Sequence, residues 1–254
     1  AKVTIGNGMN LDLTFNPDFS QVEVDDQIIN MTRFEINLPE KRQFFIQNSD
    51  LFSGFGDSRD SRTFFSRRIG VARDKNGNTI ENKITAGLRL SGKISKNTRL
   101  GILNMYTNED LKNNIKANTN SVIALQQKLF SRSNVSLLFI NRQNTAKNEL
   151  DYNRVIGVDY NLLSKDAVWD GKFYFHNSFS DLNKTNPFST GFTLSYNTRN
   201  NSIYSKVIRL GQGFESDLGF IRRKGIFKNY FRYQRRFWLK NKKIRSVNLI
   251  SSLS

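Results

Sequence analysis

The cations of this chain are the side chains with the clearest capacity for chemistry, because they are numerous and concentrated. The formal net charge is +17, yet residues 1–60 hold five basic and ten acidic residues, whereas residues 201–254 hold thirteen basic and two acidic ones. In residues 230–240 the cations interleave with aromatic residues, as they do in grooves that bind single-stranded nucleic acid. The spacing, however, is that of a strand with Arg232 and Arg236 on one face. It favours a surface that attracts anions, and we expect no nucleic acid as partner.

A second charged group lies in an irregular part of the chain, where Glu40, Lys41 and Arg42 precede Arg67 and Arg68. Carboxylates and guanidinium groups form charge-assisted hydrogen bonds, so these residues can pair with one another or with acidic neighbours and fix the segment in place. That structural role is our preferred interpretation. The alternative is that the same cations contact a transported anion.

Patterns for catalysis or metal binding are weak. The single histidine, His176, has no nucleophile elbow or zinc-ligand pair around it, and alternation places it on the water-facing side of its strand. Glu23, Asp25 and Asp26 offer oxygen ligands for calcium, but without the spacing of a known calcium loop. The absence of cysteine excludes disulfides and thiolate metal sites. We therefore expect no cofactor, no metal and no catalysis within this chain.

The elements that carry these residues are predicted to be long strands. One face of residues 84–94 holds Ile84, Ala86, Leu88, Leu90 and Ile94, and the other holds Thr85, Gly87, Arg89, Ser91 and Lys93. A period of two indicates a strand with one apolar and one polar face. Such runs extend over about nine to thirteen residues, whereas strands of soluble proteins cluster near five or six and a tilted membrane-crossing strand needs roughly nine to eleven.

The connections between these runs alternate between short and long. The short ones are residues 95–98, 131–133, 163–168, 198–201 and 239–243, and the long ones are residues 108–120, 141–153, 180–187 and 211–225. An up-and-down meander whose two ends face different compartments produces this alternation, as in bacterial outer-membrane barrels. Apolar runs in the strand region fall far short of the roughly 18 residues of a transmembrane helix.

These patterns predict an all-β fold, an antiparallel up-and-down transmembrane β-barrel of about twelve strands, either complete or part of a larger barrel. Residues 1–16 form a first hairpin with Asn7-Gly8 as its turn, residues 17–83 form a long irregular insertion that acts as plug or lid, and residues 84–254 supply ten strands. The predicted binding residues of lumen or plug are Glu40, Lys41, Arg42, Arg67, Arg68, Arg89, Lys93, Arg232 and Arg236. A soluble β-sandwich is the alternative fold.

Several motifs resemble a Bacteroidota-type outer-membrane β-barrel family of unknown function. They are residues 13–25, 32–35, 38–45, 64–70, 101–104, 152–155 and 218–222. Gln43 departs from the pattern, because a proline is expected there. The resemblance implies a chain cut from a larger protein, in which a family-nine-like carbohydrate-binding domain often precedes the barrel. We expect no such carbohydrate-binding domain within this chain. Some members of the family are labelled putative membrane-associated hydrolases.

We therefore expect a bacterial outer-membrane barrel that acts as a pore, transporter or scaffold with a basic lumen or rim. The alternative is a membrane anchor for a carbohydrate-binding or hydrolytic surface assembly. An open, basic-lined passage favours transport, whereas an interior filled with tightly bonded side chains favours anchoring. The expected partners are the lipid bilayer and lipopolysaccharide, carbohydrate through the N-terminal domain that the resemblance implies, and other outer-membrane proteins.

Overall fold

The computed structural model describes residues 1–6, 8–17, 39–73, 75, 79–145, 151–182, 184–240 and 245–254. The calcium candidates Glu23, Asp25 and Asp26 and the turn residue Asn7 lie outside the described residues, as do the motif residues 32–35. Among the described residues, no helix has the length and apolar character needed to cross a membrane.

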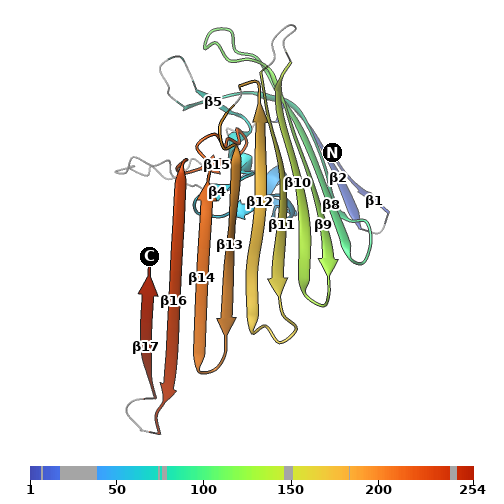
Figure 1. Cartoon of the computed structure of the whole chain (residues 1–254). Coiled ribbons are helices and arrows are strands. Elements are labelled where there is room, and N and C mark those ends of the chain that lie inside the picture. Colours follow the sequence, from blue (N-terminus) through green and yellow to red (C-terminus); the bar gives the residue numbers. More distant parts are fainter. Residues whose placement is uncertain are drawn as a thin grey trace.

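A single antiparallel sheet of twelve strands dominates the fold, with its strands side by side in chain order (Figure 1). The strands are β1 (Lys2–Ile5), β2 (Met9–Phe15), β7 (Ile84–Lys93), β8 (Thr98–Thr107), β9 (Asn118–Leu129), β10 (Ser133–Asn144), β11 (Tyr152–Leu163), β12 (Trp169–Ser180), β13 (Phe188–Asn197), β14 (Asn201–Leu210), β16 (Ile226–Trp238) and β17 (Ser246–Leu253). The predicted all-β antiparallel meander is confirmed.

The sheet is open rather than closed into a barrel. Within the described ranges, β1 pairs with β2 alone and β17 pairs with β16 alone, so each forms an edge. The long connections gather at one end of the sheet and the short turns at the other, as the alternation of the sequence predicts (Figure 1). The short turns are held by local bonds, such as that from Ser95 Oγ to Thr98 Oγ1 at 2.8 Å.

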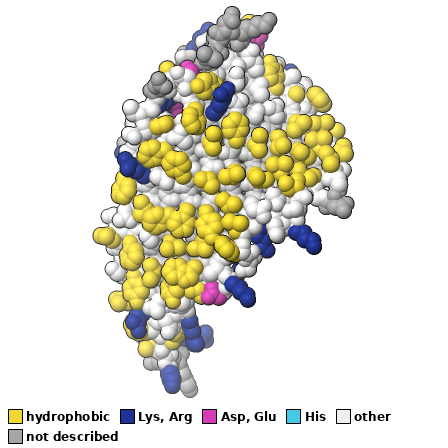
Figure 2. All heavy atoms as spheres, turned by 45° about the vertical axis from the view of Figure 1, so that its right-hand side comes forward, with side chains coloured by type: hydrophobic (Ala, Val, Ile, Leu, Met, Phe, Trp, Pro, Cys, Tyr) yellow, Lys and Arg dark blue, Asp and Glu magenta, His cyan; other side chains and the backbone are white. Residues whose placement is uncertain are grey.

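One face of the sheet, which we call the open face, presents apolar side chains to the exterior. Its exposed members include Leu88, Ile123, Leu137, Ile156, Val158, Phe173, Phe175, Phe227, Phe231, Phe237, Val247, Leu249 and Leu253. Aromatic rings stack between neighbouring strands, and the ring centroids of Phe173 and Phe192 lie 5.9 Å apart. Figure 2 shows the hydrophobic side chains spread across the sheet, with Lys and Arg side chains mainly near its margins.

The predicted position of Ile84 on this face is wrong. The register between β7 and β8 shifts between Ile84 and Ala86, and such a bulge places one extra residue in a strand and breaks its alternation. Ile84 is consequently buried in the core on the other face, together with Met105, while Leu88 remains on the open face.

The second face, called the covered face here, is overlaid by residues 39–73, which we name the insert. The insert contains α1 (Gln43–Ile46), α2 (Asp50–Ser53), β3 (Gly56–Asp57), β4 (Ser61–Arg62), the 3-10 helix η1 (Ser66–Arg68) and β5 (Val71–Arg73). β5 pairs with β6 (Thr79–Glu81), and β4 lies between β3 and β15 (Phe220–Ile221) in a small sheet. The connection between β14 and β16 therefore folds back onto the insert.

An apolar core joins the insert to the sheet. The insert supplies Phe45, Leu51, Phe52, Phe55, Phe64 and Ile69, the strands supply Leu103, Met105, Val122, Ala124, Leu138, Ile140, Val155 and Leu210, and the β14–β16 connection supplies Phe214 and Leu218. Gly101 on β8 permits a close approach of α2 to the sheet, because a Cβ atom there would lie 2.6 Å from Cζ of Phe52. The covered face of β8–β11 is therefore filled by packed side chains.

Candidate functional site

The N-terminal strands hold the insert through Arg89, a predicted site residue on β7. Its side chain is only 3% exposed, and Nη2 lies 2.7 Å from Oδ2 of Asp12 on β2. Nη1 donates to the carbonyl oxygens of Phe44 and of Gln47, the latter at 2.8 Å. Arg89 lies on the polar side of its strand, as alternation predicts, but its guanidinium group is enclosed by contacts to the protein. Its role here is to join the insert to the sheet.

The predicted charged group of the insert forms bonds within the insert itself. Arg42 Nη2 lies 2.8 Å from Oε2 of Glu40, and the same guanidinium donates to the carbonyl oxygens of Ile69 and Ser66. Burial raises the pKa of Glu40, but hydrogen bonds from Arg42 and Ser66 outweigh it and hold that pKa below its ordinary value. The carboxylate is therefore charged at neutral pH and braces the segment.

The other predicted residues are dispersed. Arg67 donates to the carbonyl oxygen of Pro39 at 2.5 Å, and Arg68 donates to that of Gly219 at 3.0 Å. Lys41 is half-buried in the insert, and Lys93 is exposed at the end of β7. Arg232 and Arg236 are exposed on β16 and donate to side chains on their own face, Gln234 at 3.1 Å and Asn248 at 3.0 Å. The nine residues are thus spread over the covered face and do not form one site.

A buried polar network fixes the middle of the insert to β11 and β12. His176 Nε2 lies 2.6 Å from Oδ1 of Asp159, and its Nδ1 lies 2.6 Å from Oγ1 of Thr63. The backbone N–H of Gly56 donates to Oδ2 of Asp159 at 3.0 Å. Gly157 lets the ring lie against β11, because a Cβ atom there would lie 2.2 Å from Cδ2 of His176. The imidazole ring of His176 on β12 thus links β11 to the insert.

The prediction that His176 points toward water is wrong, because the insert covers its side of the strand. The side chains of His176 and Thr63 have no exposed surface. A carboxylate, an imidazole and a hydroxyl in this order can activate a nucleophile, but the reaction requires a substrate atom beside the hydroxyl. The enclosed Oγ1 atom leaves no room for a substrate, so the network acts in docking the insert.

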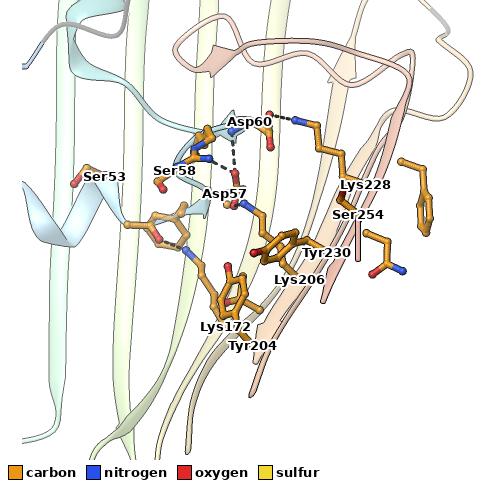
Figure 3. A pocket seen from close by; sticks show the side chains of 17 residues that line it. Ser53, Asp57, Ser58, Asp60, Lys172, Tyr204, Lys206, Lys228, Tyr230 and Ser254 are labelled. Carbon is orange, nitrogen blue, oxygen red and sulfur yellow. Dashed lines mark hydrogen bonds and ion pairs between the residues drawn. The ribbon is translucent and has the colours of Figure 1, made fainter. Parts of the chain in front are cut away.

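A hollow of about 920 Å³ lies beside the insert, between its residues 53–60 and strands β12, β13, β14 and β16 (Figure 3). The residues that line it are Ser53, Gly54, Phe55, Gly56, Asp57, Ser58, Arg59, Asp60, Lys172, Thr193, Tyr204, Lys206, Phe227, Lys228, Asn229, Tyr230 and Ser254. A volume of this size is typical of small-molecule sites, roughly 300–1,000 Å³. We take this hollow as the candidate functional site.

Three lysines, each from a different strand, reach carboxylates at the hollow. Lys206 on β14 lies 2.7 Å from Asp57 and Lys228 on β16 lies 2.5 Å from Asp60, both in the insert. Lys172 on β12 lies 2.9 Å from Asp159 and also donates to the carbonyl oxygen of Gly54. Figure 3 shows the three side chains directed toward residues 54–60. Ion pairs therefore contribute to the attachment of this side of the insert to β12, β14 and β16.

The two aspartates of the insert differ in their support. Asp57 accepts hydrogen bonds from the backbone N–H groups of Arg59 and Asp60, at 3.1 and 2.9 Å, in addition to its ion pair with Lys206. Burial raises the pKa of Asp57, but Lys206 and these backbone donors hold that pKa below its ordinary value. The carboxylate of Asp60 has Lys228 as its charged partner.

None of the nine predicted site residues lines the hollow. Lys228 was predictable on the polar face of β16, and the same alternation places Lys172 and Lys206 on the polar faces of their strands. The position of Asp57 and Asp60 opposite them has no counterpart in the local sequence pattern. Glu40 and Arg89 line a smaller cavity of about 250 Å³ between insert and sheet.

The fold and the site define an all-β protein in which an insert packs against one face of an open twelve-stranded antiparallel sheet and leaves a charged hollow beside it. The chain belongs to the family described as "Domain of unknown function (DUF5916)", which matches residues 1–254. No curated protein and no solved structure matches the chain.

Proposed function

We propose that this chain forms the lipid-facing wall of a β-barrel in the bacterial outer membrane, with the insert as an internal plug. The observation that carries the proposal is the contrast between the two faces of the sheet. Large apolar side chains such as Val158, Phe175 and Phe231 are exposed on the open face, while Arg89 and Asp159 are buried on the covered face. Extended exposed apolar surfaces of this kind mark membrane or partner contacts.

Strand length and direction support the same proposal. Strands β7–β14 contain ten to twelve residues each, which meets the roughly nine to eleven residues that a tilted strand needs to cross a bilayer. The edges β1 and β17 require partners in lipid, because each unpaired backbone group there costs several kcal/mol. The proposal therefore includes further strands, from a longer chain or from another outer-membrane protein, next to these edges.

The function that we favour is a pore or transporter with a restricted passage. The covered face of β8–β11 is filled by the apolar core, so the route for a solute runs along β12–β16, where the hollow lies. Beyond the hollow, toward the C-terminal end of β16, Arg232 and Arg236 are exposed on the same face as Lys228. A passage with this lining attracts anions and repels cations.

A static anchor is the second candidate, and the apolar core favours it. Among the described residues, seventeen buried side chains join the insert, the strands and the β14–β16 connection. An insert packed in this way does not dissociate from the sheet as a rigid unit. In that function the barrel holds a surface assembly, including a carbohydrate-binding partner, and lipopolysaccharide surrounds its outer rim. The two candidates differ in whether the hollow conducts.

Ion conductance of the full chain in planar bilayers separates these candidates. The test compares the wild type with the double variant Asp57→Asn, Asp60→Asn, which weakens the ion pairs beside the hollow, and with Asp166→Asn in an exposed turn as matched control. A passage predicts anion-selective conductance that rises in the double variant and stays unchanged in the control. A complete lack of conductance in all three proteins would leave the anchor, and a protein soluble without detergent would contradict both.

A further inference from the structure

We propose that the hollow binds a phosphate monoester, and that this ligand competes with Asp60 for Lys228. The inference deepens the proposed function, since it rests on the hollow being open to water and names the class of solute. It is built on three features of the hollow: its cations, its aromatic pair, and the unequal support of its two carboxylates.

The cations of the hollow converge from both of its sides. Lys172, Lys206 and Lys228 come from three different strands, and Arg59 comes from the insert. The exposed fractions of the lysine side chains are 22%, 19% and 47%, respectively. An ammonium group has three donor hydrogens, so one carboxylate partner does not exhaust it. Groups of this kind bind phosphate oxygens as point charges.

The charge balance favours an anion over a neutral solute. Four cationic side chains line the hollow, namely Arg59, Lys172, Lys206 and Lys228, against the lining carboxylates of Asp57 and Asp60 and the buried carboxylate of Asp159, which pairs with Lys172. A phosphate monoester carries about −1.5 to −2 charges at pH 7 and three acceptor oxygens. It therefore matches the sign of the remaining charge and the surplus of donors.

An aromatic pair offers a surface for the organic part of such a ligand. The ring centroids of Tyr204 on β14 and Tyr230 on β16 lie 5.9 Å apart, and both side chains line the hollow. Each ring presents an apolar body with a hydroxyl group at its end. Tyr230 lies directly opposite Lys206 in the register of β14 and β16, and Tyr204 and Lys228 are each two residues along their strand from this pair. A phosphorylated sugar can therefore contact the rings and the cations together.

Ligand binding is coupled to the insert through Asp60. Asp57 keeps two backbone donors when Lys206 turns to a ligand, whereas Asp60 gives up its ion pair when Lys228 does so. The side chain of Asp60 is only 3% exposed, and a buried carboxylate without its partner is unfavourable. Binding of the phosphate is therefore expected to loosen the contact between residues 57–60 and β16.

Calorimetric titration of the detergent-solubilised full chain with glucose 6-phosphate tests the proposal, with glucose as the uncharged comparison. We expect binding of glucose 6-phosphate and none of glucose. Lys228→Gln and Arg59→Gln should each weaken binding about tenfold, equivalent to 1.4 kcal/mol, while Lys165→Gln in an exposed turn should bind like the wild type. Arg59 is exposed, so its replacement keeps the test valid if Lys228→Gln impairs folding.

Equal affinity of Lys228→Gln, Arg59→Gln and the wild type would overturn the proposal, as would equal binding of glucose. Vesicles that contain lipid A provide a second source of the same phosphate chemistry. Binding to these vesicles that depends on Lys228, without binding of glucose 6-phosphate, would contradict a soluble ligand. Membrane insertion is measured separately by flotation of vesicles. A protein that binds glucose 6-phosphate but does not insert into vesicles rejects the membrane wall alone. A protein that inserts but does not bind glucose 6-phosphate rejects the phosphate site alone.

Discussion

Replacement of Gly157 by alanine is predicted to release the middle of the insert from the sheet. A Cβ atom at this position would lie 2.2 Å from Cδ2 and 2.8 Å from Nε2 of His176. The ring must move by more than 1 Å, since ordinary contacts of this kind begin at about 3.4 Å. Because the ring bridges Asp159 and Thr63 at 2.6 Å on each side, this movement breaks both hydrogen bonds.

The size of the effect follows from the two bonds. A hydrogen bond to a charged group contributes about 1.5–3 kcal/mol, and one between neutral groups contributes about 0.5–1.5 kcal/mol. Loss of the contacts to Asp159 and Thr63 should therefore lower the free energy of local opening by about 3 kcal/mol. With a factor of ten for each 1.4 kcal/mol, amide exchange in the opened segment accelerates by about a hundredfold.

Hydrogen–deuterium exchange at Gly56 provides the assay, because its N–H donates to Asp159 in the same network. The matched comparison is Gly157→Ala in a His176→Ala background, where the ring that causes the clash is absent. We expect the added methyl group to accelerate exchange strongly in the wild-type background and little in the second one. Equal effects in the two backgrounds, or no effect in either, would refute the role assigned to the ring.

Two further perturbations test the other attachments of the insert. The pKa of Asp57 is lower in the folded protein than its ordinary value of 3.8. Its contribution to stability is therefore present above about pH 4 and disappears as pH falls through the folded value. The exchange rate of residues 54–60, relative to that of the unfolded chain at the same pH, should rise below pH 4, and a ratio that does not change with pH would contradict this. Replacement of Arg89 by methionine leaves Asp12 buried without its partner and should lower the free energy of unfolding by about 3–5 kcal/mol; unchanged denaturant unfolding would show that the ion pair is dispensable.

The sequence predicts the sheet well because its determinants are local. Period-two alternation and turn residues lie within single strands and hairpins, and they locate the twelve strands and the alternation of short and long connections. The bulge between Ile84 and Ala86 is the exception. It shifts one residue to the other face without a change in the apolar pattern, so alternation alone assigned Ile84 incorrectly.

The candidate site was not predictable in the same way, because its contacts join distant segments. Thr63 and His176 are 113 positions apart, and Asp60 and Lys228 are 168 positions apart. The local charge clusters at residues 40–42 and 67–68 predict a site there, but their bonds mainly stabilise the insert. The part of the β14–β16 connection that enters the core also follows from tertiary packing rather than from its local sequence.

The central claim is that the open face contacts lipid, and single-cysteine labelling tests it directly because the chain contains no cysteine. A bimane label is placed at Val158 or Phe231 on the open face, and at Arg232 or Arg236 on the covered face of β16. In vesicles, brominated acyl chains should quench the first pair and aqueous iodide the second. Quenching of the labels at Val158 and Phe231 by iodide, with no effect of the brominated lipid, would contradict a membrane-embedded wall.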